Sequence, residues 1–301
     1  MDAKIKKYNI GEFKIIQVGA VFGGECFLII GSKNTFLIDS GFAFCGERTA
    51  GNIRRELGDR PLDYILLTHS HFDHAGGSPV IAAAYPNVKI VCHERAVKVF
   101  KKQSALRFMQ GMDDTAAEMN GWELRHDILN QLHVDIPVTD GFTLHTADTD
   151  VLVLDGQGHT RDSIGYFFKQ IRLIVSNESA CILIEGCGEK PIPEFIVSYQ
   201  ATLDTISRFE AQNADHLLIS HHGVISGRAA EDFFRKARIA CEDVAAIVMD
   251  AHAEGLSVEE IARKVAHKYH DQRAKAFQSD EAYLVNMRAM IPRLIEEQGG
   301  G

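Results

Sequence analysis

The chain has 301 residues and a formal net charge of −9 at pH 7, with 46% apolar and 24% charged residues. This composition is typical of a soluble globular protein that can bury a large core, and it excludes a disordered chain. The negative charge argues against nucleic acid as the main partner, because such binders need a basic surface to displace counterions from phosphates.

The N-terminal stretch "MDAKIKKYNIGEF" lacks the apolar segment of a signal peptide, and no later apolar run approaches the length of a membrane span. We therefore expect a cytoplasmic protein that binds no membrane. The six cysteines form no C-x-x-C pair in a chain too large to need disulfides, so reduced thiols are expected.

From its N-terminus to about residue 93, the chain alternates between strand and helix patterns. Short β-rich runs separated by turn residues predict strands, and longer amphipathic runs predict helices. The expected strands are 13–18, 26–30, 35–39, 63–68 and 88–92, and the expected helices are 48–57 and 78–85. Alternation of this kind predicts an α/β layer protein.

Between residues 94 and 135 the apolar residues recur at helical spacing. This methionine-rich stretch either completes the core or caps a site. Strands are expected again at 151–156, 164–169, 171–176 and 216–220. Helices are then expected at 229–253, 256–268 and 279–297, the second with an N-cap at Ser257. We predict a domain over 1–227, with a helical insertion at about 94–135, and a helical extension over 228–301 packed on it.

The segment "THSHFDH" at residues 68–74 places three histidines and an aspartate directly behind an apolar run. At a strand end, the spacing of His69 and His71 can direct both imidazoles the same way. Asp73 and His74 follow as the chain turns toward a helix. So many buried imidazoles without partners would cost several kcal/mol. The cluster therefore predicts a metal site, with one pair of ligands for each of two neighbouring ions.

The remaining ligands should come from other strand ends. His159 follows a glycine-rich turn, Glu178 follows the run "IRLIVS", and either His221 or His222 follows "HLLIS". All could converge on one edge of a sheet. The isolated histidines are interpreted as ordinary core or surface residues; these are His93, His126, His133, His145 and His252.

Four motifs in order resemble the metallo-β-lactamase superfamily: "FLIDSG", "HSHFDH", "GHT" and "HHG". The resemblance covers roughly residues 10 to 227 and implies a four-layer αββα sandwich with a metal site at one edge. The length, the helical insertion and the helical tail are similar to the quinolone-signal-response thioesterase-like branch and, more distantly, to glyoxalase II.

Carried over to this chain, the resemblance implies ligands for two metals. His69, His71 and His159 would bind the first ion, Asp73, His74 and His222 the second, and Glu178 would bridge them. His222 is preferred to His221 because the last histidine of the family directly precedes glycine, here Gly223. Asp39 would orient a ligand, or it only satisfies backbone groups at a strand end.

One departure from the family pattern concerns the bridging ligand. The family usually has aspartate preceded by glycine where this chain has Asn177 and Glu178. Glutamate keeps the charge but is one methylene longer, so it could bridge from a shifted backbone, bind one metal only, or swing out. Imidazole and carboxylate ligands without thiolate suit zinc, iron or manganese, with zinc preferred.

We expect a metal-dependent hydrolase in which a metal-bound hydroxide attacks a thioester or ester of a small, partly apolar acyl substrate. Asp73 would accept a proton. Alternatives are a lactonase, a phosphodiesterase, a mononuclear iron oxygenase, or a weakly catalytic signalling or binding protein. The expected partner is a small molecule, with a possible homodimer through the C-terminal helices.

Overall fold

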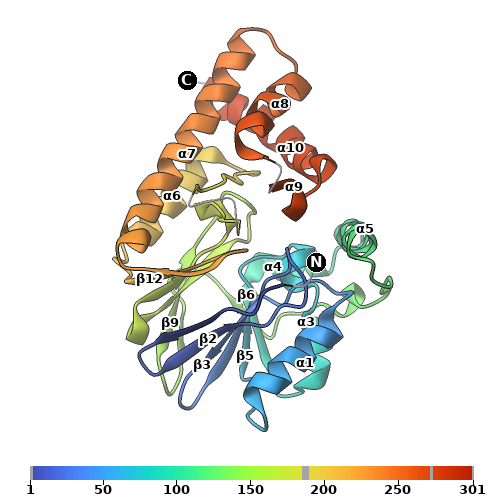
Figure 1. Cartoon of the computed structure of the whole chain (residues 1–301), viewed down its shortest axis with the longest axis vertical. Coiled ribbons are helices and arrows are strands. Elements are labelled where there is room, and N and C mark those ends of the chain that lie inside the picture. Colours follow the sequence, from blue (N-terminus) through green and yellow to red (C-terminus); the bar gives the residue numbers. More distant parts are fainter. Residues whose placement is uncertain (1–2, 185–189, 272–273, 300–301) are drawn as a thin grey trace. The chain divides into compact units, whose positions relative to one another are not determined.

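A computed structural model describes residues 3–184, 190–271 and 274–299 (Figure 1). The chain forms two compact units. The first comprises Met1–Leu154 and Tyr166–Val175, and the second comprises Asp155–Gly165 and Ser176–Gly301. The expected division between a domain ending at 227 and an extension beginning at 228 stays a prediction.

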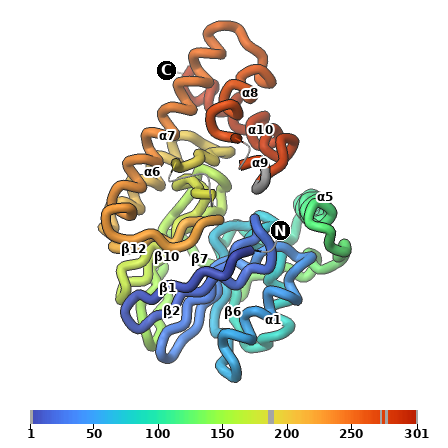
Figure 2. The backbone as a smooth tube through the Cα atoms, viewed as in Figure 1, coloured from blue at the N-terminus to red at the C-terminus, as the bar shows by residue number. Residues whose placement is uncertain are grey.

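The first unit contains a seven-stranded sheet with its strands in sequence order. These strands are β1 (Lys7–Ile10), β2 (Phe13–Gln17), β3 (Phe27–Ile30), β4 (Thr35–Ile38), β5 (Tyr64–Leu66), β6 (Lys89–His93) and β7 (Ile136–Val138). The strands from β1 to β4 are antiparallel, and those from β4 to β7 are parallel. Figure 2 shows the hairpin of β1 and β2 in dark blue. All four residues of β4 are buried, as expected for a central strand covered on both faces.

Helices of the first unit follow or connect the parallel strands. They are α1 (Gly46–Leu57), α2 (Phe72–Ala75), α3 (Ser78–Ala84), α4 (Glu94–Phe100), α5 (Gln103–Asn120) and a 3-10 turn, η1 (Leu129–Gln131). Ile53 of α1 and Ile81 of α3 belong to one buried cluster with Leu37 of β4 and Ile65 of β5, so these helices cover one face of the sheet. The expected helical insertion is confirmed as α4, α5 and η1.

The second sheet has the strand order β13-β12-β11-β10-β9-β8. Its strands are β8 (Thr143–His145), β9 (Asp150–Asp155), β10 (Ile164–Phe168), β11 (Leu173–Val175), β12 (His216–Ile219) and β13 (Gly223–Ser226), and a 3-10 turn, η2 (Lys169–Ile171), joins β10 to β11. Within the first unit the two sheets pack face to face. The ring of Phe168 lies edge-on to Phe36 at 5.2 Å, and the Tyr166 hydroxyl donates to the Leu67 carbonyl at 2.7 Å.

The second unit also contains helices. Its helices are η3 (Glu178–Ala180), α6 (Tyr199–Glu210), α7 (Arg228–Ala253), α8 (Val258–Tyr269), α9 (Ala274–Phe277) and α10 (Asp280–Gly299). Ser257 and Glu260 form the expected capping box at the start of α8. The expected α/β fold with two sheets and a helical C-terminal extension is confirmed.

Two further expectations concern membrane spans and cysteines. In the part of the chain that the structure describes, no helix is both long and apolar enough to cross a membrane. The five described cysteines are not joined by disulfides, and Cys187 lies outside the described residues.

Candidate metal centre

One group of candidate metal ligands, in the first unit, lies where β4 and β5 end. These strands are parallel neighbours, so their carboxyl ends meet at the same edge of the sheet. Asp39 directly follows β4, and Thr68 and His69 follow β5. Residues far apart in sequence therefore lie close together: the backbone N–H of Thr68 donates to Oδ1 of Asp39 at 2.7 Å.

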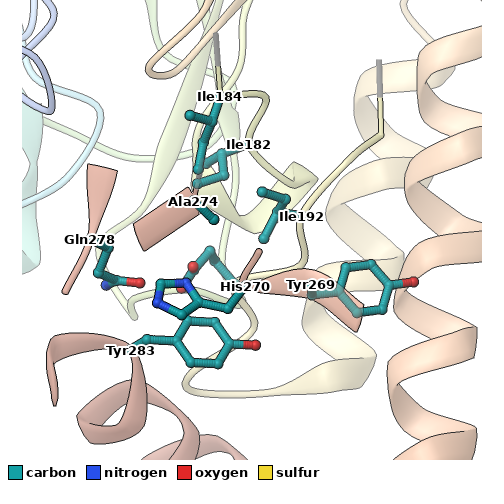
Figure 3. A pocket seen from close by; sticks show the side chains of 9 residues that line it. Ile182, Ile184, Ile192, Tyr269, His270, Ala274, Gln278 and Tyr283 are labelled. Carbon is teal, nitrogen blue, oxygen red and sulfur yellow. The ribbon is translucent and has the colours of Figure 1, made fainter. Parts of the chain in front are cut away.

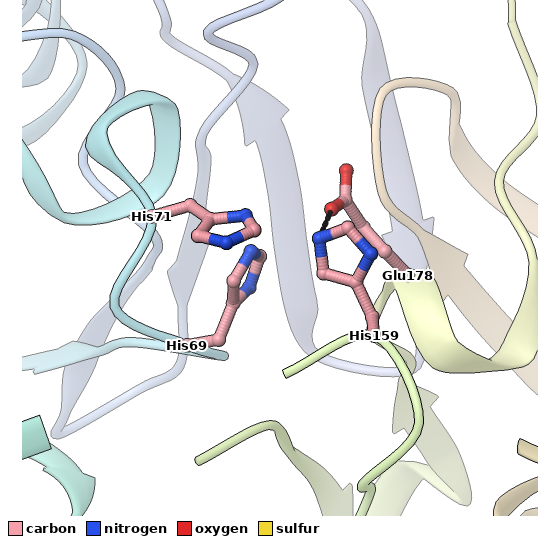
Figure 4. A group of neighbouring side chains, drawn as sticks. All are labelled: His69, His71, His159 and Glu178. Atoms are coloured by element: carbon pink, nitrogen blue, oxygen red, sulfur yellow. Dashed lines mark ion pairs between the residues drawn. The ribbon is translucent and has the colours of Figure 1, made fainter. Parts of the chain in front are cut away.

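Four residues behind β5 form what we call the first ligand set: His69, His71, Asp73 and His74. The ligand atoms of His69 and His71 lie within 4.8 Å of each other, and their rings are drawn in Figure 4. His71 is the N-cap of the short helix α2, which carries Asp73 and His74. His69 and His74 are buried, whereas His71 and Asp73 are half-buried.

His74 lies between two carboxylates. Its Nδ1 is 2.9 Å from Oδ2 of Asp39, and its Nε2 is 3.4 Å from Oδ2 of Asp73. Burial opposes the charged imidazolium, but the charges of Asp73 and Asp39 prevail and hold the pKa of His74 well above its ordinary value. A divalent cation next to this ring would replace the proton as partner of the carboxylates.

The second unit contributes what we call the second ligand set: His159, Glu178 and His221. His159 lies in the loop between β9 and β10, where Ser179 Oγ accepts its backbone N–H at 2.8 Å. Its Nδ1 donates to the carbonyl of Glu194 at 2.7 Å. Because a carbonyl can only accept, the Nδ1 carries a hydrogen, which leaves Nε2 as the ring nitrogen that could bind a metal ion.

Glu178 opens the 3-10 turn η3, whose N-cap is Asn177. Its Oε2 is 2.5 Å from Nε2 of His159, the pair joined by a dashed line in Figure 4. Its Oε1 is 2.7 Å from Nε2 of His221. Burial opposes a charged His159, but the Glu178 carboxylate prevails and raises the pKa of this imidazole. The two oxygens of one carboxylate are therefore directed to two different imidazoles.

A tight turn between β12 and β13 carries two adjacent histidines, His221 and His222, and directs only one of them toward Glu178. His221 has a φ of 62° in the left-handed region, and its side chain is buried against Glu178. His222 is half-buried and belongs to neither group of possible metal ligands in the described residues. His221 therefore belongs to a group of possible metal ligands, whereas the expected ligand was His222; the assignment of the last ligand stays a prediction. The other expected ligands lie in the two ligand sets.

A buried carboxylate that sequence reasoning missed lies behind His159. Glu194 is 5% exposed, and burial raises the pKa of its carboxyl to about 7. Its Oε2 accepts from Nδ2 of Asn286 at 3.3 Å. The signal in the sequence was a single glutamate within the otherwise apolar run "PIPEFIV".

Asp113 of α5 was missed as well, because it sits on a helix read only for its apolar positions. Its side chain is fully buried and accepts the backbone N–H of Ala43 at 2.9 Å. Burial raises the pKa of this carboxyl to about 7. Through this hydrogen bond, Asp113 restrains the loop that follows β4 in sequence and that begins with Asp39.

The donor chemistry of both sets fits divalent metal ions. Each set combines imidazole nitrogens with carboxylate oxygens, the ligands that suit zinc, iron and manganese. Two of the histidines, His74 and His159, already have their second ring nitrogen held, by Asp39 and by the Glu194 carbonyl. Ligating histidines in metalloproteins have such partners, which fix the tautomer.

The fold and these side chains define the chain as an α/β protein with two sheets and groups of His, Asp and Glu placed for metal. The model of the metallo-β-lactamase superfamily matches residues 19–221. The chain belongs to this superfamily, as its ordered motifs predicted.

Relatives and solved structures agree with this assignment. The hydroxyacylglutathione hydrolase of Haemophilus ducreyi is 27% identical over 54% of this chain, and the match spans about half of that relative's own length. The acyl-coenzyme A thioesterase MBLAC2 of Gallus gallus is 23% identical over 74% of this chain and 82% of its own. The metallo-β-lactamase family protein TTHA1429 from Thermus thermophilus has a TM-score of 0.62 at 16% identity, covering 96% of this chain and 94% of that one.

Proposed function

We propose that the two ligand sets together hold two divalent metal ions, with zinc preferred, and that the chain hydrolyses acyl thioesters at this centre. The proposed ligand groups are His69, His71, His159 and Glu178 for one ion, and Asp73, His74, Glu178 and His221 for the other. Glu178 belongs to both groups, so it is the proposed bridge.

The observation that carries the proposal is the orientation of Glu178. One oxygen faces His159 at 2.5 Å and the other faces His221 at 2.7 Å. A bridging carboxylate needs this division of its oxygens between two sites. The longer glutamate is compatible with bridging because η3, with its cap at Asn177, sets the backbone position from which the side chain extends.

Two bound ions would lower the pKa of a water molecule and polarise the oxygen of the acyl carbonyl. The chain's own residues would supply the rest. Asp73 is the proposed proton acceptor, because its side chain is 18% exposed, whereas those of His74 and Glu178 are 2% and 8% exposed. A substrate can therefore reach Asp73 more easily than its buried neighbours.

An acyl thioester is the proposed substrate class because the named relatives act on acyl-coenzyme A or acylglutathione, both of which are thioesters. A thiolate is also a better leaving group than an alkoxide near neutral pH, since thiol pKa values are about 8.5. The site then needs a proton acceptor but little help from an acid.

The test combines elemental analysis of the purified chain with a substrate panel of acyl-coenzyme A, acylglutathione, a simple ester, a lactone and a phosphodiester. We expect two metal ions per chain and the fastest turnover with a thioester, followed as released thiol. A chelator should abolish the activity, and added metal should restore it. A fully loaded chain that hydrolyses no member of the panel would overturn the proposal. One iron per chain would point instead to mononuclear chemistry.

A further inference from the structure

Helix α10 of the C-terminal extension is bonded to a segment that also contacts the loop of His159. Residues 194–200 connect the chain after Ile192 to the start of α6, and α10 contacts them at three places. The bonds are Asn286 Nδ2 to Glu194 Oε2 (3.3 Å), Arg293 to the carbonyl of Ile196 (3.0 Å), and the backbone N–H of Tyr199 to Glu297 Oε2 (2.9 Å). These contacts fix residues 194–200 against one helix.

The same segment holds the loop that carries His159. The carbonyl of Glu194 accepts from Nδ1 of His159 at 2.7 Å. One residue before the histidine, the carbonyl of Gly158 accepts the backbone N–H of Val197 at 2.8 Å and of Ser198 at 3.2 Å. Both the ring and the backbone of this loop therefore depend on where residues 194–198 lie.

Glu194 is one of the residues that line a narrow pocket of the second unit; others that line it are drawn in Figure 3. Ile182 and Ile192 form one wall, and His270 and Tyr283 form another, with their rings stacked at 4.2 Å. Such walls exclude most water from the carboxyl group, so the bond from Asn286 is worth more than a surface hydrogen bond. Asn286 thus restrains Glu194 more strongly than its 3.3 Å distance alone implies.

We propose that Glu194 and Asn286 are positioning residues for the metal ligand His159, so that the C-terminal extension sets the metal affinity of the centre. Asn286 holds the Glu194 side chain, which in turn fixes its backbone carbonyl. That carbonyl keeps the His159 ring in the orientation that points Nε2 toward Glu178. The inference rests on the proposed function only in taking His159 as a metal ligand, and it requires no turnover.

The experiment measures the zinc dissociation constant of the full chain by competition with a chromophoric chelator. Loss of a residue that orients a ligand typically costs about 10- to 100-fold in metal affinity. We expect such a loss in Asn286→Ala and Glu194→Ala. Glu194→Gln keeps an oxygen that can accept from Asn286, so its affinity should stay within about threefold of the unmodified chain.

The matched control is Val285→Ala, because Val285 adjoins Asn286 on α10 but is 40% exposed. It should leave zinc affinity unchanged. Proton NMR of the metal-free chain gives a second readout: the Nδ1 hydrogen of His159, which the Glu194 carbonyl accepts, should exchange with solvent more slowly in the unmodified chain than in Asn286→Ala. Asn286→Ser is a milder variant with the same expected direction, should the alanine variant not fold.

Unchanged zinc affinity and unchanged exchange of the His159 Nδ1 hydrogen in folded Asn286→Ala and Glu194→Ala would overturn the inference while leaving the proposed function intact. An unmodified chain that binds zinc but cleaves no thioester would sink the proposed reaction, and the positioning role would stand on the affinity data. Failure of the unmodified chain to bind any metal would overturn both.

Discussion

The Oδ2 atom of Asp39 lies 2.9 Å from Nδ1 of His74, and the same carboxylate accepts the backbone N–H of Thr68 at 2.7 Å. Asp39 therefore contacts the ring of His74, a candidate ligand, and also ties the end of β4 to the end of β5. These two roles were alternatives in the sequence, and the structure contains both contacts.

Replacing Asp39 should weaken metal binding without removing a ligand. We expect Asp39→Ala to raise the metal dissociation constant by about 10- to 100-fold, because the His74 ring loses the partner that orients it. Asp39 has a φ of 55°, which asparagine tolerates better than alanine. Asp39→Asn separates the loss of charge from backbone strain and should show a smaller loss. Equal affinity in all three proteins, measured by chelator competition, would rule out this orienting role.

The bridging role of Glu178 predicts a change in metal stoichiometry. Glu178→Gln lacks one of the two anionic oxygens that face His159 and His221, so the variant should retain at most one ion per chain. Glu178→Asp keeps the charge but shortens the side chain by one methylene, and we expect it to hold fewer than two ions. Elemental analysis of the three proteins after identical dialysis measures this. Two ions in Glu178→Gln would contradict a bridge.

The adjacent histidines at 221 and 222 offer a matched pair. Nε2 of His221 faces Glu178 at 2.7 Å, so His221→Ala should lose the second ion and most of the hydrolytic activity. His222→Ala has the same change in composition one residue later and should keep two ions. If His222→Ala instead lost an ion and His221→Ala kept both, His222 would be the ligand, as its position before Gly223 predicted.

Asp113 predicts a pH dependence of stability. Its carboxyl has a folded-state pKa of about 7, above the ordinary value of 3.8. Between these values the folded chain holds a proton that the unfolded chain has released, so stability falls as pH rises through this window. One proton contributes a slope of at most about 1.4 kcal/mol per pH unit.

Asp113→Asn removes this proton while keeping an oxygen that can accept from the Ala43 N–H. We expect the free energy of unfolding of this variant to fall less steeply between about pH 5 and 6.5 than that of the unmodified chain. Urea unfolding at several pH values, on metal-free protein, measures the difference. Parallel pH profiles would show that the carboxyl of Asp113 titrates normally.

The layer class and most of the candidate ligands could be predicted from the sequence. Apolar runs with turn residues between them located most of the longer strands and helices within a few residues, because buried positions recur with the period of the element. The helix α6 and the short strands β1, β7, β8 and β13 were not predicted. The segment behind β5 marked the first ligand set, since adjacent residues at a strand end stay adjacent in space. His159 and Glu178 were predicted by their positions after strands.

The contacts between side chains from distant segments could be seen only in the tertiary structure. His221 and His222 are neighbours in sequence, and only the left-handed backbone of the β12–β13 turn directs His221 to Glu178. Glu194 and Asn286 are 92 residues apart, and nothing local in either segment predicts their bond. Sequence patterns show which positions along a segment are buried, because buried residues recur at the spacing of a helix or strand. The partner of a buried polar atom depends instead on how distant segments pack.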